Sequence, residues 1–119
     1  MSRRNQKIGA WGESVATGYL KEQGYNILAR NHRTPYGEID IVAEKEGFIS
    51  FIEVKTRTSN SLGPPEISVT KRKQEHMLLA AEYYAQEKEI DHWQIDVIAV
   101  EGKPTESTPP KITHFESAL

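Results

Sequence analysis

Three charged residues lie in the most apolar part of the chain, where a buried strand usually carries none. Asp40 is in the run GEIDIVA, and Glu53 and Lys55 are in the run FIEVKTR. Two carboxylates suit a hard divalent cation, Mg²⁺ or Mn²⁺, and an amine beside them can orient or deprotonate water. The alternative is a structural ion network in which one acid pairs with Lys55. Because buried charge is rarely retained for stability alone, the three residues together favour a functional site.

The elements that must position these residues are two strands, 38–44 and 48–57, joined by a two-residue turn at Glu46-Gly47. A turn of this length sets Asp40 directly opposite Glu53. Opposed Cβ atoms in such pairs are about 4.5–5.5 Å apart, where two carboxylates repel unless a cation lies between them. Lys55 follows Glu53 by two residues and therefore projects from the same face. A register slip of one residue would put the two acids on opposite faces.

The rest of the pattern predicts an α/β fold in which a mixed sheet is flanked by helices, in the order α-β-β-β-α-β. Because the middle strands are apolar on both alternating faces, they need cover on both sides, and two helices can supply it. The segments 31–37 and 58–66 contain Pro and Gly and are expected to be loops, the second flanking the site. The other expected elements are helices over 8–23 and 70–88, strands over 25–30 and 92–100, and a short edge strand over 111–115.

The length and composition fit one domain over residues 1–119, with a basic N-terminal tail at 1–7 and a Pro-containing C-terminal tail at 103–119. No apolar run is long enough to span a bilayer, and no secretion signal is recognised, so we expect no membrane partner. The absence of cysteine excludes disulfides, thiolate metal sites and a Cys nucleophile. It fits a reducing, cytoplasmic location.

The charge distribution is more informative than the net charge of −2. Residues 1–33 hold six basic and two acidic side chains, whereas residues 82–119 hold eight acidic and three basic ones. The cluster TKRK at 70–73 is a second basic segment. One end of the chain is therefore suited to phosphate, although the charge pattern taken alone is better explained by solvated surface charge.

Asp40 with Glu53-Val54-Lys55 resembles the D…(D/E)xK core of the PD-(D/E)xK nuclease superfamily. The wider arrangement resembles the YraN family of endonuclease-like proteins, which is related to archaeal Holliday junction resolvases. Two departures stand out: Ile39 replaces the Pro of the superfamily's name, and Gln94 stands where the family has an Arg. The resemblance covers most of the chain and rests on the segments GAWGESVATGYLKEQGYNILARN, GEIDIVA, FIEVKTR and VTKRKQ.

This resemblance implies a three-layer restriction-endonuclease-like fold and metal-dependent hydrolysis of DNA, including branched or nicked DNA. Asp40, Glu53, the Val54 carbonyl and a helix residue, Glu13, would bind Mg²⁺ or Mn²⁺. Lys55 would act on water and on the developing negative charge. Gln74 would approach the metal-bound water from the second helix. An exposed Glu13 and a Gln74 that only bonds backbone are the alternatives.

Five basic residues are candidate phosphate contacts, because affinity for nucleic acid rests on Lys and Arg. They are Arg30, Arg33, Arg57, Lys71 and Lys73. Each taken singly is better explained as plain surface charge. Asp96, in another apolar strand, is expected to be structural and to pair with a Lys or Arg.

Three classes of function therefore remain open: a metal-dependent endonuclease, a non-catalytic DNA-binding module that keeps the nuclease fold, and an interaction protein with a structural ion network. The first two have DNA as partner. The resolvase relatives act as dimers, but no patch in the sequence decides between a monomer and a homodimer.

Overall fold

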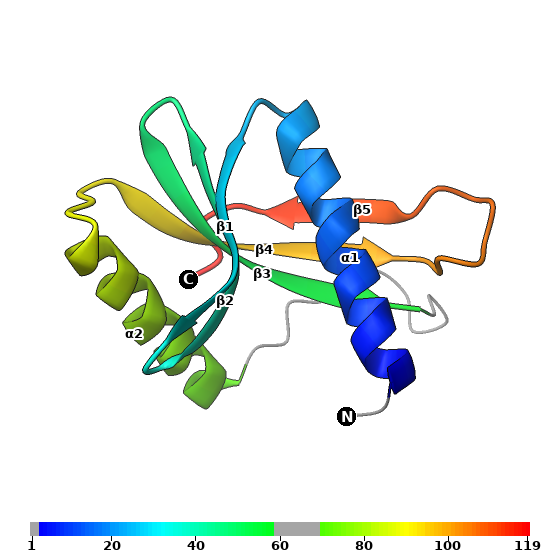
Figure 1. The fold of residues 1–119 in the computed structure, drawn as a ribbon, viewed down its shortest axis with the longest axis horizontal. Coiled ribbons are helices and arrows are strands. Elements are labelled where there is room, and N and C mark those ends of the chain that lie inside the picture. The colour runs from blue at the N-terminus through cyan, green and yellow to red at the C-terminus, as the bar shows by residue number, and fades with distance from the viewer. Residues whose placement is uncertain (1–2, 59–69) are drawn as a thin grey trace.

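The computed structural model describes residues 3–58 and 70–119. The helices and strands follow the predicted order, and the expected short edge strand is present at the end (Figure 1). Their bounds are α1 Arg3–Glu22, β1 Asn26–Thr34, β2 Gly37–Lys45, β3 Phe48–Arg57, α2 Lys71–Glu87, β4 Trp93–Glu101 and β5 Lys111–Phe115. None of the helices within these ranges is long and apolar enough to cross a membrane.

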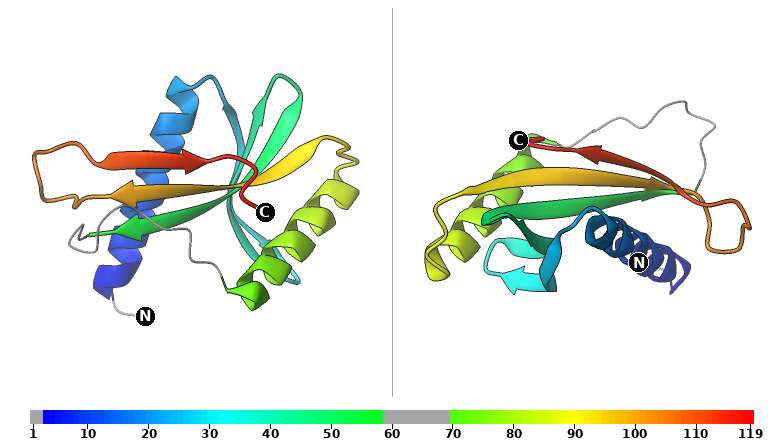
Figure 2. Two further views of the ribbon diagram at one scale, coloured as in Figure 1. Left: turned by 180° about the vertical axis from the view of Figure 1, so that it is seen from behind. Right: turned by 90° about the horizontal axis from the view of Figure 1, so that it is seen from above.

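The five strands form one mixed sheet in the order β1-β2-β3-β4-β5. Only β3 and β4 run parallel, and the other neighbours are antiparallel. Alternate residues of β3 feed two apolar clusters, with Phe51 packed against α2 and Ile52 in the cluster that contains α1 residues. The sheet therefore lies between two helices, as predicted. Figures 1 and 2 show α1 crossing the strands and α2 beside the far end of the β1–β2 hairpin.

Small residues bring α1 close to the sheet. Ala16 and Leu20 are fully buried, and a Cβ added at Gly12 would overlap the Thr56 hydroxyl. This close approach places the α1 side chains next to β2 and β3. The helix begins at Arg3, so residues 3–7 are not the tail that was predicted but its first turns.

The first strand is longer than predicted. It runs to Thr34, so the segment expected as a loop shrinks to a turn at Pro35-Tyr36. The Thr34 hydroxyl donates to the Gly37 carbonyl at 2.7 Å and accepts from the Tyr36 N–H at 3.1 Å. Backbone pairing with β2 continues to the Thr34–Gly37 pair, and these bonds outweigh the polar local sequence.

The β2–β3 hairpin has the predicted turn and register. Glu46 and Gly47 both have positive φ, at 53° and 78°, as a two-residue hairpin turn requires. The paired residues run from Lys45–Phe48 to Ile41–Ile52 and then stop. Ile39 and Ile41 belong to clusters on opposite faces, although residues two apart in a regular strand point the same way. The strand β2 therefore twists sharply around Asp40 and separates from β3.

The helix α2 begins where the TKRK segment predicts. Thr70 caps its N-terminus, and the Thr70 hydroxyl accepts from the Lys73 N–H at 3.2 Å. The buried face consists of Ala80, Ala81, Tyr84 and Ala85. Leu78 is apolar but 44% exposed, so the buried face of the helix is rotated away from it. The loop predicted over 58–66 lies, beyond residue 58, outside the described residues.

Candidate metal and phosphate site

Asp40 lies at the point where β2 and β3 separate. One step beyond the last backbone pair, the Asp40 Oδ2 atom accepts a hydrogen bond from the Val54 N–H at 2.9 Å. The backbone pairing of β2 with β3 has ended here, so the Asp40 carboxylate, rather than a β2 carbonyl, accepts the hydrogen bond from the Val54 N–H. The register is as predicted, but the ladder stops short of Asp40 and Glu53. Their side chains, rather than their backbones, meet across the gap.

The carboxyl group of Asp40 has the most perturbed acidity in this region. Its pKa is raised from 3.8 to about 7, chiefly by burial and next by the adjacent Glu53 charge, with a smaller contribution from a hydrogen bond between the two carboxyl groups. The Val54 N–H opposes this rise, and Glu13 adds to it. Three acids therefore interact at one place. This repulsion is what a divalent cation would relieve.

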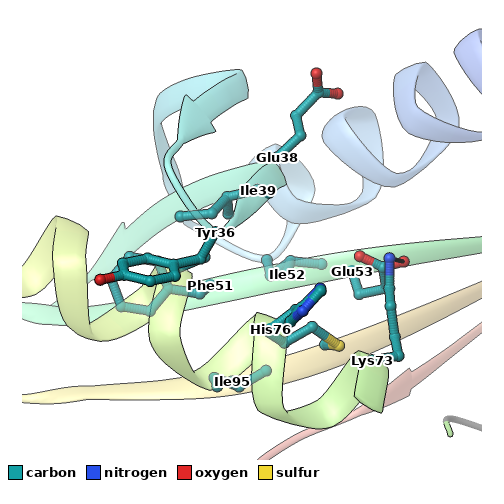
Figure 3. Close-up of a pocket in the computed structure, with 12 residues that line it drawn as sticks. Tyr36, Glu38, Ile39, Phe51, Ile52, Glu53, Lys73, His76 and Ile95 are labelled. Atoms are coloured by element: carbon teal, nitrogen blue, oxygen red, sulfur yellow. Dashed lines mark ion pairs between the residues drawn. The ribbon is translucent and has the colours of Figure 1, made fainter.

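Glu53 has a cationic neighbour that the sequence did not reveal. The Lys73 ammonium lies 3.2 Å from Glu53 Oε1, with the Glu53 side chain 13% exposed (Figure 3). Lys73 was predicted only as a phosphate contact. Its distance from Glu53 in sequence, and the rotated face of α2, left no local signal for this contact. Lys55 is half-buried two residues beyond Glu53, so alternation directs it to the same face of β3.

Glu13 reaches the rim of the same region from α1. In the amide orientation that satisfies both acids, the Asn31 side-chain nitrogen donates to Glu13 Oε1 at 2.6 Å and to Glu38 Oε1 at 3.0 Å. Burial, more than any neighbour, raises the pKa of Glu13, and Arg30 opposes the rise. Asn31 has a φ of 51°, a conformation that Asn tolerates better than most residues. That preference was the available signal for a special role at this position.

Two further predicted residues lie outside the acidic pair. Gln74 is exposed in the first turn of α2, where its backbone N–H donates to the Thr70 carbonyl at 2.9 Å, and the approach of its side chain to a metal-bound water stays a prediction. Arg57 contacts Glu101, with Nη2 2.9 Å from Oε2. Its predicted phosphate contact would have to coexist with this ion pair.

The remaining phosphate candidates are on the surface. Arg30 donates to the Ser14 hydroxyl at 3.4 Å, and Arg33 lies 4.0 Å from Glu38. Lys71 and Lys73 are exposed in the first turn of α2. The structure therefore places Lys73 at the acidic pair, Arg30 and Arg33 near its Glu13 and Glu38 side, and Arg57 further along β3.

A cavity of about 90 Å³ adjoins the acidic pair. Its wall residues come from the β1–β2 turn, from β2, β3 and β4, and from the first three turns of α2. Glu53 and Lys73 lie together at one end, and Tyr36 lies towards the other (Figure 3). The Glu38 side chain points away from the other labelled residues in this view. The site is thus an acidic pair in contact with Lys73, beside an open cavity with both polar and apolar walls.

A second acidic group is built around Asp96, which is completely buried. His114 Nε2 lies 2.8 Å from Asp96 Oδ2, and Gln94 Nε2 and the Ser117 N–H both donate to Oδ1. The prediction that Asp96 pairs with a Lys or Arg is wrong, because a histidine and an amide take that place. Tyr19 lies 3.1 Å from the other ring nitrogen of His114.

The two acidic groups differ in their fit to a metal. Within the described ranges, only Asp96, His114 and Glu116 bring three ligand atoms within 4.8 Å of one another. That group can therefore hold a metal ion, but Asp96 already has protein donors on both oxygens. Asp40 and Glu53 offer the oxygen atoms that Mg²⁺ and Mn²⁺ prefer, and they repel each other in the absence of a cation. Their chemistry fits the cation that the sequence predicted.

The fold and the acidic site define an α/β protein with a candidate metal centre where two strands part. The chain belongs to the UPF0102 family, since the model described as "Uncharacterised protein family UPF0102" matches residues 12–100. A UPF0102 protein of Syntrophotalea carbinolica is 43% identical over 121 residues, covering 100% of this chain and 96% of that protein. One of Clostridium perfringens is 47% identical over 102 residues, covering 84% of each.

Among solved structures, one described as Pyrococcus furiosus SfsA in complex with Ca²⁺ is similar at 15% identity. The match covers 90% of this chain and 61% of that chain, with a TM-score of 0.36.

Proposed function

We propose that this protein is a metal-dependent endonuclease that hydrolyses DNA phosphodiester bonds, including those of branched or nicked DNA. The observation that carries the proposal is the Asp40–Glu53 pair. Its two carboxyl groups are held together at the parting of β2 and β3, where burial and mutual repulsion raise the pKa of Asp40 to about 7. Two carboxyl groups that disfavour each other's ionised form fit a site that binds a cation between them.

In this proposal, Asp40, Glu53 and the Val54 carbonyl hold Mg²⁺ or Mn²⁺, and Glu13 contributes from α1. When bound, such a cation supplies an activated water and neutralises charge at phosphorus. Lys55 orients the water and stabilises the developing negative charge from the same face as Glu53. Gln74, at the first turn of α2, acts from the substrate side.

The substrate backbone would lie along the basic residues around this site. Lys71 and Lys73 open α2, where the backbone N–H groups of the first turn add to anion binding. Arg30 and Arg33 flank the Glu13 side, and Arg57 extends the path along β3. The resemblance to PD-(D/E)xK nucleases and to archaeal junction resolvases supports DNA as partner, a cytoplasmic setting and a homodimer that cuts two strands.

A cleavage panel tests the proposal. Junction, flap, nicked, single-stranded and duplex DNA are incubated with the protein and with Mg²⁺ or Mn²⁺. We expect metal-dependent cleavage of at least one substrate, and its loss in Asp40→Asn and Lys55→Ala. Glu44→Gln is the matched control, because it removes an acid from the same strand, away from the site. Absence of cleavage on the whole panel, or full activity of Asp40→Asn, would contradict the proposal.

A non-catalytic DNA-binding module is the second candidate, and one observation favours it. Lys73 already places a positive charge 3.2 Å from Glu53. A site neutralised from within has less need of a metal. This candidate predicts DNA binding that weakens steeply with salt, equal in the protein and in Asp40→Asn, with no cleavage by either.

A further inference from the structure

The cavity beside the acidic pair has a shape and lining that the proposed hydrolysis does not require. Its volume of about 90 Å³ compares with roughly 10–15 Å³ for a single water on the same scale. Ile39, Phe51, Met77 and Ile95 supply apolar wall, contributed by three strands and a helix. An apolar space of this size beside a charged site is suited to a flat ring rather than to water alone.

The two ends of the cavity differ in chemistry. Tyr36, at the β1–β2 turn, is 43% exposed, and its ring lies edge-to-face with that of Tyr83 at 6.3 Å between centroids, so an aromatic ring stands partly exposed at the margin. Lys73 and His76, one helical turn of α2, line the cavity, and Lys73 is also the residue in contact with Glu53 (Figure 3). An aromatic ring at one end and a cation at the other match a ligand that carries a planar ring and a phosphate.

We propose that this cavity binds an unpaired nucleobase of the DNA substrate, with the attached phosphate directed to Lys73 and the Asp40–Glu53 pair. The inference rests on the proposed function for what happens to that phosphate. Tyr36 offers a face for stacking, and the apolar wall receives the ring. A base inside a duplex is stacked and paired on all sides, so it must leave the stack to enter.

The consequence is a substrate class. The protein would favour DNA with an unpaired base next to the bond that it cuts, as in a flap, a gap or a single strand. A perfect duplex would be disfavoured by the cost of unstacking, which amounts to a few kcal/mol. Stacking is tolerant of base identity, because every base has an aromatic face. We therefore expect the protein to discriminate between DNA structures rather than between DNA sequences.

Met77 provides a direct reporter of the cavity. The chain has two methionines, Met1 and Met77, so ¹³C-methyl methionine labelling gives two signals, which Met77→Leu assigns. The full-length protein is titrated with deoxynucleoside monophosphates in EDTA, without divalent metal. We expect the Met77 methyl signal to shift, because an aromatic ring enters its surroundings, and the Met1 signal to stay. Deoxyribose 5-phosphate and inorganic phosphate should leave the Met77 signal in place.

Two variants sharpen this test. Tyr36→Ala removes the stacking ring and should weaken nucleotide binding about tenfold, in keeping with about 1–3 kcal/mol per stacked base. Phe48→Ala is the matched control, since Phe48 is another exposed aromatic residue. It lies at the start of β3, at the other end of β2 from Tyr36. It should leave nucleotide binding unchanged.

The outcomes separate this inference from the proposed function, because the titration contains no metal and measures no cleavage. An unmoved Met77 signal, or an equal shift with deoxyribose 5-phosphate, would overturn the base pocket even in a protein that cuts DNA. A shift specific to nucleotides that Tyr36→Ala weakens would support it even in a protein that does not. Equal binding by Tyr36→Ala and by the unchanged protein would rule out stacking on Tyr36.

Discussion

Two aspartates, the half-buried Asp40 and the fully buried Asp96, lie in apolar strands of the same sheet and have opposite surroundings. Asp96 receives hydrogen bonds from Gln94 and the Ser117 N–H and contacts His114, so both oxygens have partners. Asp40 receives a backbone hydrogen bond from Val54 and faces the charges of Glu53 and Glu13. The fold gives the Asp96 carboxylate partners at both oxygens, whereas it places the Asp40 carboxylate beside other acids.

The difference teaches how to interpret buried acids in a strand. A satisfied carboxylate holds elements together: Asp96 joins β4 to His114 on β5 and to the turn that follows it. A carboxylate set against another acid lowers the stability of the fold, and such groups are found where function needs them. The comparison therefore makes opposite predictions for the same substitution at the two positions.

The largest effect is expected for Asp40→Asn above pH 7. The folded protein holds the Asp40 proton up to a pKa of about 7, against 3.8 ordinarily, so folding loses stability as the pH rises between these values. The amide removes this cost and can still accept from Val54. We expect a gain in the free energy of unfolding of up to about 4 kcal/mol above pH 7, and almost none near pH 4. Urea unfolding at both pH values measures it.

A destabilised Asp40→Asn variant at neutral pH would break the comparison, because it would mean that the ionised Asp40 is held by favourable contacts. A gain that does not depend on pH would point to packing rather than to charge.

The second effect is that of Asp96→Asn, which should destabilise the protein by about 3 kcal/mol. An amide offers donors where Gln94 and Ser117 already donate, so buried hydrogen-bonding groups are left unmatched. Urea unfolding at neutral pH measures this loss, with Glu116→Gln, at an exposed neighbouring acid, as control. A change smaller than that of the control would mean that Asp96 is not the anchor of β5.

Gln94→Ala should have a smaller effect, about 1 kcal/mol, because it removes one of the donors to Asp96. The family that the chain resembles has an Arg at this position. In this protein the Gln94 amide donates a hydrogen bond to Asp96. Thermal unfolding of Gln94→Ala beside Asp96→Asn and the double variant measures the coupling. Additive effects would indicate that the amide and Asp96 act independently.

The smallest effect on stability is expected for Lys73→Met. The Lys73 side chain is 46% exposed, so its ion pair with Glu53 contributes less than about 1 kcal/mol. Loss of this internal cation should tighten Mn²⁺ binding at the acidic pair and weaken DNA binding. Calorimetric titrations with Mn²⁺, and with DNA in EDTA, measure the two changes. Lys71→Met, at the first residue of α2, is the matched control for Mn²⁺ binding, and an equal change in Mn²⁺ affinity in the two variants would contradict this role of Lys73.

Much of the fold was predictable because hydrophobic periodicity and turn chemistry determine it locally. The register of the hairpin followed from Glu46-Gly47, and the alternating apolar faces of β3 predicted a helix on each side. The length of β1 was not predictable, since its polar C-terminal half is held by pairing with β2 rather than by its own sequence. The start of α1 at Arg3 was missed because its first turns carry no apolar stripe.

The candidate site was predictable in part for the same reason. Side-chain alternation and the turn length predicted that Asp40 lies near Glu53. They did not predict that the pairing of β2 with β3 ends at Ile41–Ile52, because this end depends on the twist of β2. Contacts between distant segments gave no local signal. Lys73 with Glu53, and His114 with Asp96, are of this kind.

The most direct test of the central claim is calorimetric titration of the protein with Mn²⁺ at neutral pH, beside Asp40→Asn and Glu116→Gln. The claim is that the Asp40–Glu53 pair is the metal centre, and the Asp96–His114–Glu116 group is its rival. We predict saturable binding that Asp40→Asn abolishes and Glu116→Gln leaves unchanged. Binding that survives in Asp40→Asn and disappears in Glu116→Gln would contradict the account.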